Sequence, residues 1–121
     1  MTGADLATFE FEPRERATVV RIRGEVDLSN AERLHDELSS RVGEASWLVL
    51  DLSGCHYLDS AGLGVIATIH ARCRARGVQL RIVVPTSAAT IDRVLAITGM
   101  DGVLQVDRSI EEALALADAA G

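Results

Sequence analysis

Alternating apolar and polar residues predict strands at the start of the chain. Residues 8–12 and 18–24 alternate with a period of two on either side of a short polar stretch, which is typical of a β-hairpin. Residues 46–53 form a nearly continuous apolar run, as expected of a strand covered on both faces. Residues 78–84 predict another strand, and residues 102–106 a short final one. We therefore expect five strands, the first two forming a hairpin.

Helical spacing of apolar residues predicts four helices. Ser29 with Glu32, and Ser109 with Glu112, have the spacing of capping boxes at helix starts. The predicted helices cover residues 27–43, 61–77, 85–99 and 109–117. Their expected buried faces are formed by Ala31, Leu34, Leu38 and Val42; Gly62, Val65, Ile66, Ile69 and Cys73; Ile91, Val94 and Leu95; and Ile110, Ala113, Leu114 and Ala117.

The predicted order of elements is ββαβαβαβα. Strands that alternate with helices favour an α/β fold with a mixed, largely parallel sheet covered by about four helices. No linker, repeat or low-complexity segment divides the chain, so we expect a single domain over residues 1–121. Open sheets of this type carry their functional residues in loops at the carboxyl ends of strands. The predicted loop from Ser53 to Ser60 lies at such a place.

Composition and charge narrow the range of partners. The chain has 121 residues, of which 48% are hydrophobic, and its formal net charge is -6. A negative field repels phosphate backbones and anionic lipid, so we expect neither nucleic acid nor membrane as a partner. The start of the chain has no secretion signal pattern, and no apolar run reaches the ~18 to 20 residues that a membrane span needs. We expect a cytoplasmic protein with free thiols.

Ser60, in the stretch HYLDSAGLGVI (56–66), has three interpretations. It is the N-cap of the helix that follows, or Asp59 is the cap and the Ser60 hydroxyl is free to face a partner and carry a phosphate. A third interpretation makes it a catalytic nucleophile, which needs a nearby base such as His56 or His70 and an oxyanion hole. The stretch LDSAG is not the G-x-S-x-G nucleophile elbow, which argues against hydrolase chemistry.

Two weaker patterns concern cofactors and metals. Residues 62–67 (GLGVIA) match G-x-G-x-x-A, but no acidic residue follows at the spacing of a dinucleotide site, so we interpret Gly62 and Gly64 as glycines of close helix packing. Two thiols and two imidazoles would suit zinc, but their spacing departs from known zinc motifs. These four residues are Cys55, His56, His70 and Cys73. We interpret them as ordinary thiols and histidines, and we expect neither a cofactor nor a metal.

A short basic stretch lies near the end of the second predicted helix. We interpret it as a solvated helix end rather than a docking patch; its residues are Arg72, Arg74 and Arg76.

Two stretches together resemble a known family. Residues 23–31 (RGEVDLSNA) and 49–66 (VLDLSGCHYLDSAGLGVI) are similar to the STAS-domain family, in particular to bacterial anti-sigma factor antagonists. The family pattern reads roughly G-E-[LV]-D-x-x-x-A and then D-L-S-x-x-x-x-[LMIV]-D-S-[ST/A]-G-L-G. The similarity covers nearly the whole chain, including the order of its elements. Ala61 departs from many relatives, which carry a second hydroxyl at that position.

The resemblance implies a STAS fold and a partner switch without enzymatic activity. An anti-sigma factor that is also a serine kinase of the GHKL ATPase type would bind the unphosphorylated protein and release its sigma factor. Phosphorylation at Ser60 would abolish that binding, and a PP2C-type phosphatase would restore it. The resemblance assigns recognition of the kinase to Asp27, Asp59, Leu58, Ala61, Gly62, Leu63 and Gly64, within a docking block from Leu58 to Ile66.

Two further hypotheses concern regulation. The domain could instead be a STAS scaffold or ligand-sensing module in a larger regulatory complex, without kinase-driven release. Cys55, just before the second motif, could add redox sensitivity.

Overall fold

The computed structural model describes residues 6–120, and its elements follow the predicted order. The strands are β1 (Ala7–Pro13), β2 (Ala17–Val26), β3 (Trp47–Leu58), β4 (Gln79–Val83) and β5 (Val106–Asp107). The helices are α1 (Ala31–Ser39), α2 (Ser60–Arg76), α3 (Ala89–Thr98) and α4 (Ile110–Ala120), with a short 3-10 helix, η2 (Met100–Gly102), after α3. The prediction of one domain and that of no secretion signal also rest on residues 1–5 and 121, which lie outside the described residues.

The sheet is mixed and largely parallel, as predicted. Its strand order is β1-β2-β3-β4-β5. β1 pairs antiparallel with β2, with Phe9 opposite Ile22, which confirms the hairpin. The pairs β2 with β3, β3 with β4 and β4 with β5 are all parallel, so the carboxyl ends of these strands lie at one edge of the sheet.

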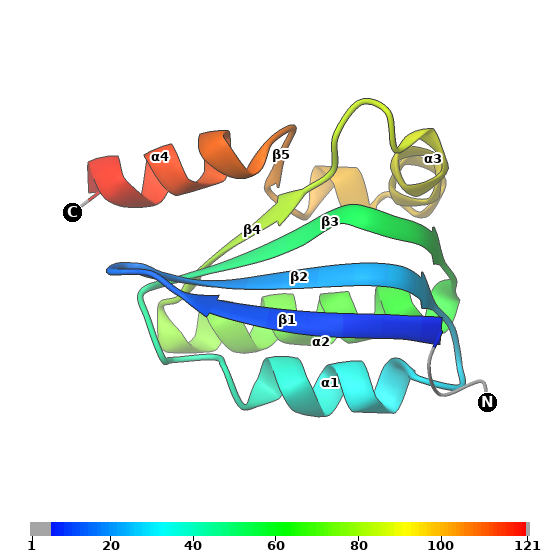
Figure 1. Ribbon diagram of the computed structural model, residues 1–121, viewed down its shortest axis with the longest axis horizontal. Coiled ribbons are helices and arrows are strands. Elements are labelled where there is room, and N and C mark those ends of the chain that lie inside the picture. Colours follow the sequence, from blue (N-terminus) through cyan, green and yellow to red (C-terminus); the bar gives the residue numbers. More distant parts are fainter. Residues whose placement is uncertain (1–5, 121) are drawn as a thin grey trace.

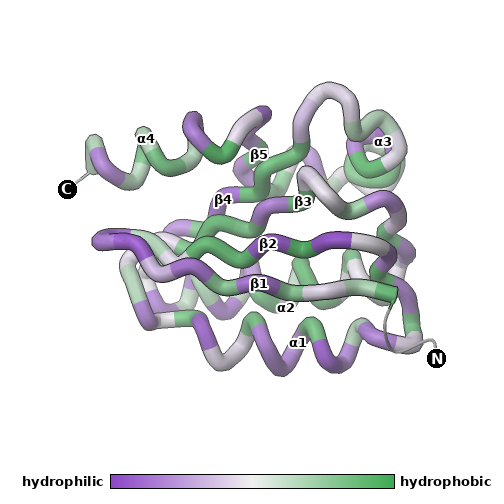
Figure 2. The backbone as a smooth tube through the Cα atoms, viewed as in Figure 1, coloured by the Kyte–Doolittle hydropathy of each residue, from purple (hydrophilic) through white to green (hydrophobic). Residues whose placement is uncertain are grey.

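Helices cover both faces of the sheet. Figure 1 shows α1 and α2 together on one face, and α4 on the other near the amino ends of β2 and β3. The larger core lies between the sheet and the helices α1, α2 and α3, and Figure 2 shows hydrophobic residues both in the strands and along these helices. Ile22, Leu34, Leu50 and Ile66 are wholly buried there. A smaller core, formed by Ala17, Val19, Val49, Val83, Ala113 and Ala117, lies beneath α4.

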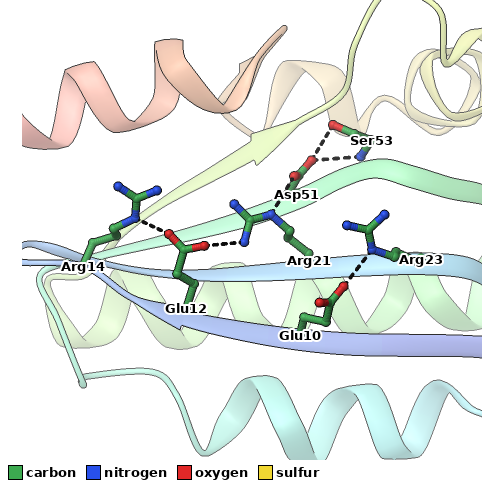
Figure 3. Close-up of polar contacts among 7 residues, drawn as sticks. All are labelled: Glu10, Glu12, Arg14, Arg21, Arg23, Asp51 and Ser53. Atoms are coloured by element: carbon green, nitrogen blue, oxygen red, sulfur yellow. Dashed lines mark hydrogen bonds and ion pairs between the residues drawn. The ribbon is translucent and has the colours of Figure 1, made fainter.

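Beyond α4, the same sheet face carries a network of charged residues (Figure 3). Glu12 on β1 bonds to Arg21 on β2 at 2.6 Å and also to Arg14, while the neighbouring Arg23 and Glu10 pair at 2.7 Å. The hydrogen bond from Arg21 is the main reason why the pKa of Glu12 is lowered. On this part of the sheet, which none of the described helices covers, the ion pairs give the charged side chains partners at a polar surface.

Asp51 extends this network into the second motif. It is 8% exposed, and its Oδ1 accepts hydrogen bonds from the backbone N–H of Ser53 at 2.9 Å and from the Ser53 hydroxyl at 2.5 Å. The D-L-S portion of the motif thus stabilises the course of β3 before the strand reaches the candidate site.

Two predicted strand boundaries are wrong. Residues 53–58 are not a loop, because β3 continues to pair with β2 through two register irregularities as far as Val26 and Leu58. The glycine and polar residues of this half of the strand resemble a loop in sequence, although hydrogen bonds to β2 keep it extended. At the other end of the chain, most of the predicted strand 102–106 forms η2 and a turn, and only Val106 and Asp107 pair with β4.

The helices begin later than predicted at two places. α1 begins at Ala31 rather than near residue 27, since the intervening residues form a turn, and α3 begins at Ala89 after a turn closed by the Ala88 N–H on the Pro85 carbonyl. Four residues predicted to be buried are only partly so, whereas Leu63, which was not among the residues of a predicted buried face, is buried; the four are Val65, Val94, Ile110 and Leu114. None of the described helices combines the length and apolar character needed to cross a bilayer.

Candidate functional site

The two motifs meet at the carboxyl ends of β2 and β3. Val26 and Leu58 are paired in the parallel ladder, and the Asp59 N–H donates a hydrogen bond to the Val26 carbonyl at 3.2 Å. Asp27 and Asp59 each follow one member of this pair. The turn into α1 and the start of α2 therefore lie at the same end of the sheet, which Figure 1 shows at the right.

Asp59, and not Ser60, caps α2. The Asp59 backbone is extended, and its Oδ1 accepts hydrogen bonds from the N–H groups of Ala61 at 2.9 Å and Gly62 at 3.0 Å. The N-cap interpretation of Ser60 is therefore wrong. Ser60 is the first residue of the helix and is exposed, and its hydroxyl has no hydrogen-bond partner among residues 6–120.

This cap also changes the argument about a phosphate. Free N–H groups at a helix start favour a phosphate, but the carboxylate of Asp59 already occupies two of those of α2. A phosphate there would lie beside a negative charge rather than in a vacant cradle of N–H groups.

The turn between β2 and α1 is fixed by two side chains. Asp27 Oδ1 accepts hydrogen bonds from the Ser29 N–H at 2.8 Å and from the Ser29 hydroxyl at 2.5 Å. Asn30, only 2% exposed, accepts from the Asp27 N–H at 3.0 Å and donates to the Glu25 carbonyl at 2.9 Å. The predicted capping box of Ser29 with Glu32 is wrong, because the Ser29 hydroxyl turns back to Asp27 and Asn30 stands at the N-cap position. Asn30 was not predicted as a site residue. Its only signal in the sequence is its position between Asp27 of the first motif and the start of α1.

The capping box predicted for α4 is present in a slightly different form. The Ser109 hydroxyl accepts a hydrogen bond from the Glu112 N–H at 3.1 Å. The Glu112 carboxylate, in turn, accepts from the Arg108 N–H at 3.0 Å, one residue before the cap.

Three of the seven predicted recognition residues are buried. Leu58 and Leu63 are 2% and 7% exposed, and Gly62 is also buried. A side chain at Gly62 would place its Cβ 2.5 Å from Leu58 Cδ1 and 2.8 Å from Val26 Cγ1, so this glycine allows α2 to lie close to the sheet. Leu58, Gly62 and Leu63 therefore belong to the packing of α2 against the sheet.

Four of the seven predicted recognition residues are accessible, two of them on α2. Ala61 is partly exposed and Gly64 is exposed, with no heavy atom within 4 Å of the position that a Cβ would take. The packing interpretation of Gly64 is therefore wrong. Together with Ser60, Asp27 and Asp59, these residues leave a surface on which small and acidic groups face outward.

The thiols and histidines show no reactive arrangement. Cys55 and Cys73 are buried and free, and burial raises the pKa of both thiols. A raised pKa lowers the fraction of thiolate, which is the form that oxidants attack, so the redox hypothesis for Cys55 gains no support. Within residues 6–120 the histidines, cysteines and acids form no group of three that could hold a metal. Neither His56 nor His70 forms a hydrogen bond with Ser60 in that part of the chain, as the nucleophile hypothesis would require.

A shallow hollow of about 300 Å³ lies close to Cys55. It is lined by Ser53, Cys55 and His56 on β3 and by residues 87–91 at the start of α3. Its size is at the lower end of the range of small-molecule sites.

The family comparison agrees with the motifs. The model of the family described as STAS domain matches residues 8–113. A relative named anti-sigma-F factor antagonist RsfA, from Mycobacterium tuberculosis, is 31% identical over 104 residues, which cover 83% of this chain and 79% of that protein. Osmosensory protein A from the same organism is 37% identical over 67 residues, or 55% of this chain; the match spans only 42% of that longer relative.

Solved structures share the fold. An anti-sigma factor antagonist from Mycobacterium paratuberculosis superposes with a TM-score of 0.84 at 24% identity, over 98% of this chain and 99% of that one. The anti-sigma factor antagonist SpoIIAA in its unphosphorylated form gives a TM-score of 0.72 at 18% identity, over 88% of this chain and 93% of that one. SpoIIAA from Bacillus has also been solved in its phosphorylated form, with a TM-score of 0.66 at 19% identity, over 88% of this chain and 96% of that one.

Proposed function

Because the chain belongs to the STAS domain family, we propose that it is an anti-sigma factor antagonist whose Ser60 is a phosphorylation switch. The unphosphorylated protein binds an anti-sigma serine kinase of the GHKL ATPase type in the cytoplasm, and the kinase then releases a sigma factor. Phosphorylation of Ser60 ends the interaction, and a PP2C-type phosphatase reverses it. In this proposal the domain is a substrate and a binding module, and it needs no catalytic residue, metal or cofactor of its own.

The observation that carries the proposal is the division of roles between Asp59 and Ser60. Asp59 accepts hydrogen bonds from the N–H groups of Ala61 and Gly62 in the first turn of α2, so this cap does not depend on the neighbouring hydroxyl. Ser60 is exposed at the end of the sheet where both motifs meet, as a kinase substrate must be. The antagonist role is supported by the relative RsfA, an anti-sigma-F factor antagonist. The phosphorylation switch is supported by SpoIIAA, which shares this fold and has been solved in unphosphorylated and phosphorylated forms.

The switch would act through charge. A phosphoserine adds about -1.5 to -2 charges at neutral pH, next to Asp59 and near Asp27, in a chain whose formal net charge is already -6. A partner surface that accepts two carboxylates and a neutral hydroxyl would then face a much larger negative charge. A loss of about 3 kcal/mol in binding free energy corresponds to more than a hundredfold in affinity. No large conformational change is required.

The test is intact-protein mass spectrometry after incubation with ATP and each GHKL-type anti-sigma kinase of the host. We expect the wild type to gain the mass of one phosphate and Ser60→Ala to gain none. Ser87→Ala, which removes another exposed hydroxyl away from the motif, is the matched control and should behave like the wild type. A phosphate that persists in Ser60→Ala would contradict the assignment of the site.

Binding measurements separate the switch from the fold. Ser60→Asp should weaken binding to that kinase, whereas Ser60→Ala should bind it constitutively and release sigma. Both variants should keep the wild-type stability to within about 0.5 kcal/mol, because the side chain is exposed. A variant that unfolds would show that Ser60 is structural.

The alternative function is a STAS scaffold or ligand-sensing module. The hollow beside Cys55 is the observation that favours it. Absence of phosphate with every candidate kinase, together with a stable larger complex or a bound small molecule that is insensitive to Ser60→Ala, would support this alternative.

A further inference from the structure

Leu28 is an exception among the aliphatic residues next to the candidate site. It is 82% exposed, although Val26, two positions earlier, is wholly buried. Tyr57, on the adjacent strand, is 44% exposed. Both residues lie within two positions of the paired Val26 and Leu58, so they flank the junction of the two motifs.

The backbone on both sides of Leu28 is held rigidly. Asp27 and Ser29 are joined through the Asp27 carboxylate, and the buried Asn30 ties the turn to the last residues of β2. The carbonyl of Asp27 also accepts hydrogen bonds from the N–H groups of Asn30 at 3.2 Å and Ala31 at 2.9 Å. A side chain presented by an ordered turn loses little backbone entropy when it is buried against a partner.

The charges around Leu28 indicate what such a partner offers. Asp27 and Asp59 each use Oδ1 for local hydrogen bonds, whereas Oδ2 has no hydrogen-bond or ion-pair partner among the described residues. Both side chains are partly exposed. The surface therefore combines a protruding aliphatic group with two acceptor oxygens.

We propose that Leu28 and Tyr57 are the apolar anchors by which the unphosphorylated protein binds its anti-sigma kinase. The kinase surface that fits them is an apolar recess bordered by basic side chains or N–H donors facing Asp27 and Asp59. This inference rests on the proposed function. It adds the residues that bind the kinase, whereas the phosphorylation state of Ser60 controls whether the kinase is released.

A second copy of this chain fits the surface poorly. A symmetric contact would bring Asp27 and Asp59 of one copy near the same residues of the other, between two chains that each carry a formal charge of -6. The anchors are therefore assigned to a partner with positive or donor groups.

The experiment compares the affinity of Leu28→Gln with that of the wild type for each GHKL-type anti-sigma kinase of the host. Calorimetric titrations contain a non-hydrolysable ATP analogue so that Ser60 stays unmodified. The control is Ile97→Gln, because Ile97 is 77% exposed and lies on α3, which packs on β3 and η2. Leu28→Met, which keeps an apolar side chain of similar size, is the rescue variant.

We expect Leu28→Gln to weaken binding about tenfold to a hundredfold, the loss that follows from leaving a leucine side chain in water. Tyr57→Gln should weaken it as well, while Leu28→Met and Ile97→Gln should bind within about threefold of the wild type. Circular dichroism and the melting temperature should be unchanged in all four variants, since each side chain is exposed.

The possible failures are distinguishable. If the wild type binds a kinase and Leu28→Gln binds equally well, the anchor assignment is overturned and the phosphorylation switch survives. Equal weakening by Ile97→Gln would overturn it too, because the effect would then follow surface apolarity in general. If the wild type binds no kinase, the proposed function fails and the anchors fall with it; self-association lost in Leu28→Gln by sedimentation would then assign the surface to a second copy.

Discussion

Gly62 and Gly64 lie two residues apart on α2, yet alanine should have opposite effects at the two positions. Both are helical, so either substitution by alanine gains about 0.5 to 1 kcal/mol of intrinsic helix stability. At Gly64 nothing lies within 4 Å of the new methyl group, and the whole gain should appear as increased stability. At Gly62 the methyl group would lie 2.5 Å from Leu58 Cδ1 and 2.8 Å from Val26 Cγ1.

The neighbours of Gly62 have little room to move. Val26 is wholly buried and stiff at χ1, and Leu58 is only 2% exposed within the same core. Overpacking of this kind costs about 1 to 3 kcal/mol. After the gain in helix propensity, Gly62→Ala should be about 1 kcal/mol less stable than the wild type, so the two variants should differ by about 2 kcal/mol.

The assay is urea unfolding followed by far-UV circular dichroism on the two alanine variants and the wild type. A difference of 2 kcal/mol between variants corresponds to roughly 6 to 10 °C in melting temperature for a chain of this length. A stabilised Gly62→Ala would refute the close approach of α2 to Val26 and Leu58. A destabilised Gly64→Ala would show that this glycine has a structural partner after all.

Two further predictions concern the turn and the thiols. Asn30→Ala should lower the free energy of unfolding by about 1 to 3 kcal/mol, because it removes two part-buried hydrogen bonds, one from the Asp27 N–H and one to the Glu25 carbonyl, each worth about 0.5 to 1.5 kcal/mol. Urea unfolding measures this change, and an unchanged midpoint would contradict it. Cys55 and Cys73 should react with a thiol reagent at neutral pH only as the protein unfolds, since both are buried, and rapid modification of the native protein would be the contrary result. Because burial raises the pKa of both thiols, the folded state favours their protonated form, so this contribution to stability is complete below the ordinary thiol pKa of about 8.5 and is lost as the pH rises above it. Unfolding curves between neutral and alkaline pH, compared with those of the double Cys→Ala variant, would detect that loss.

Periodicity was sufficient to predict the architecture because the core residues are regular. The stripe of Leu34 and Leu38 and the alternation around Ile22 are buried as their spacing requires. The extent of β3 could not be predicted in this way. Its last residues, from Ser53 to Leu58, are strand only because β2 continues beside them, and a sequence window does not contain that partner.

The site shows the same limit at the level of single hydrogen bonds. Both Asp59 and Ser60 are possible caps from the sequence, and the hydrogen bonds from the N–H groups of Ala61 and Gly62 show that Asp59 is the cap. The capping-box spacing of Ser29 was misleading because Asp27 offers its hydroxyl a nearer acceptor. Gly62 and Gly64 occur in the same sequence pattern. Only the structure shows that a Cβ at Gly62 would lie against Leu58 and Val26, whereas a Cβ at Gly64 would have no neighbour within 4 Å.

In the proposed switch, the helix cap is Asp59 and the residue that accepts the phosphate is Ser60. This separation allows a phosphorylation site to lie at the start of a helix. If Ser60 were the N-cap, its phosphorylation would alter the hydrogen bonds that begin α2, and each change of partner would also change stability by about 1 kcal/mol. Asp59 removes that coupling by taking both N–H groups with one carboxylate oxygen. In the proposed switch, these two N–H groups are not available to a phosphate on Ser60, because they are already bonded to the Asp59 carboxylate, and the added charge would lie beside that carboxylate. Under the proposed switch, Asp59 would cap the helix in both phosphorylation states, and Ser60 would be free to differ between them.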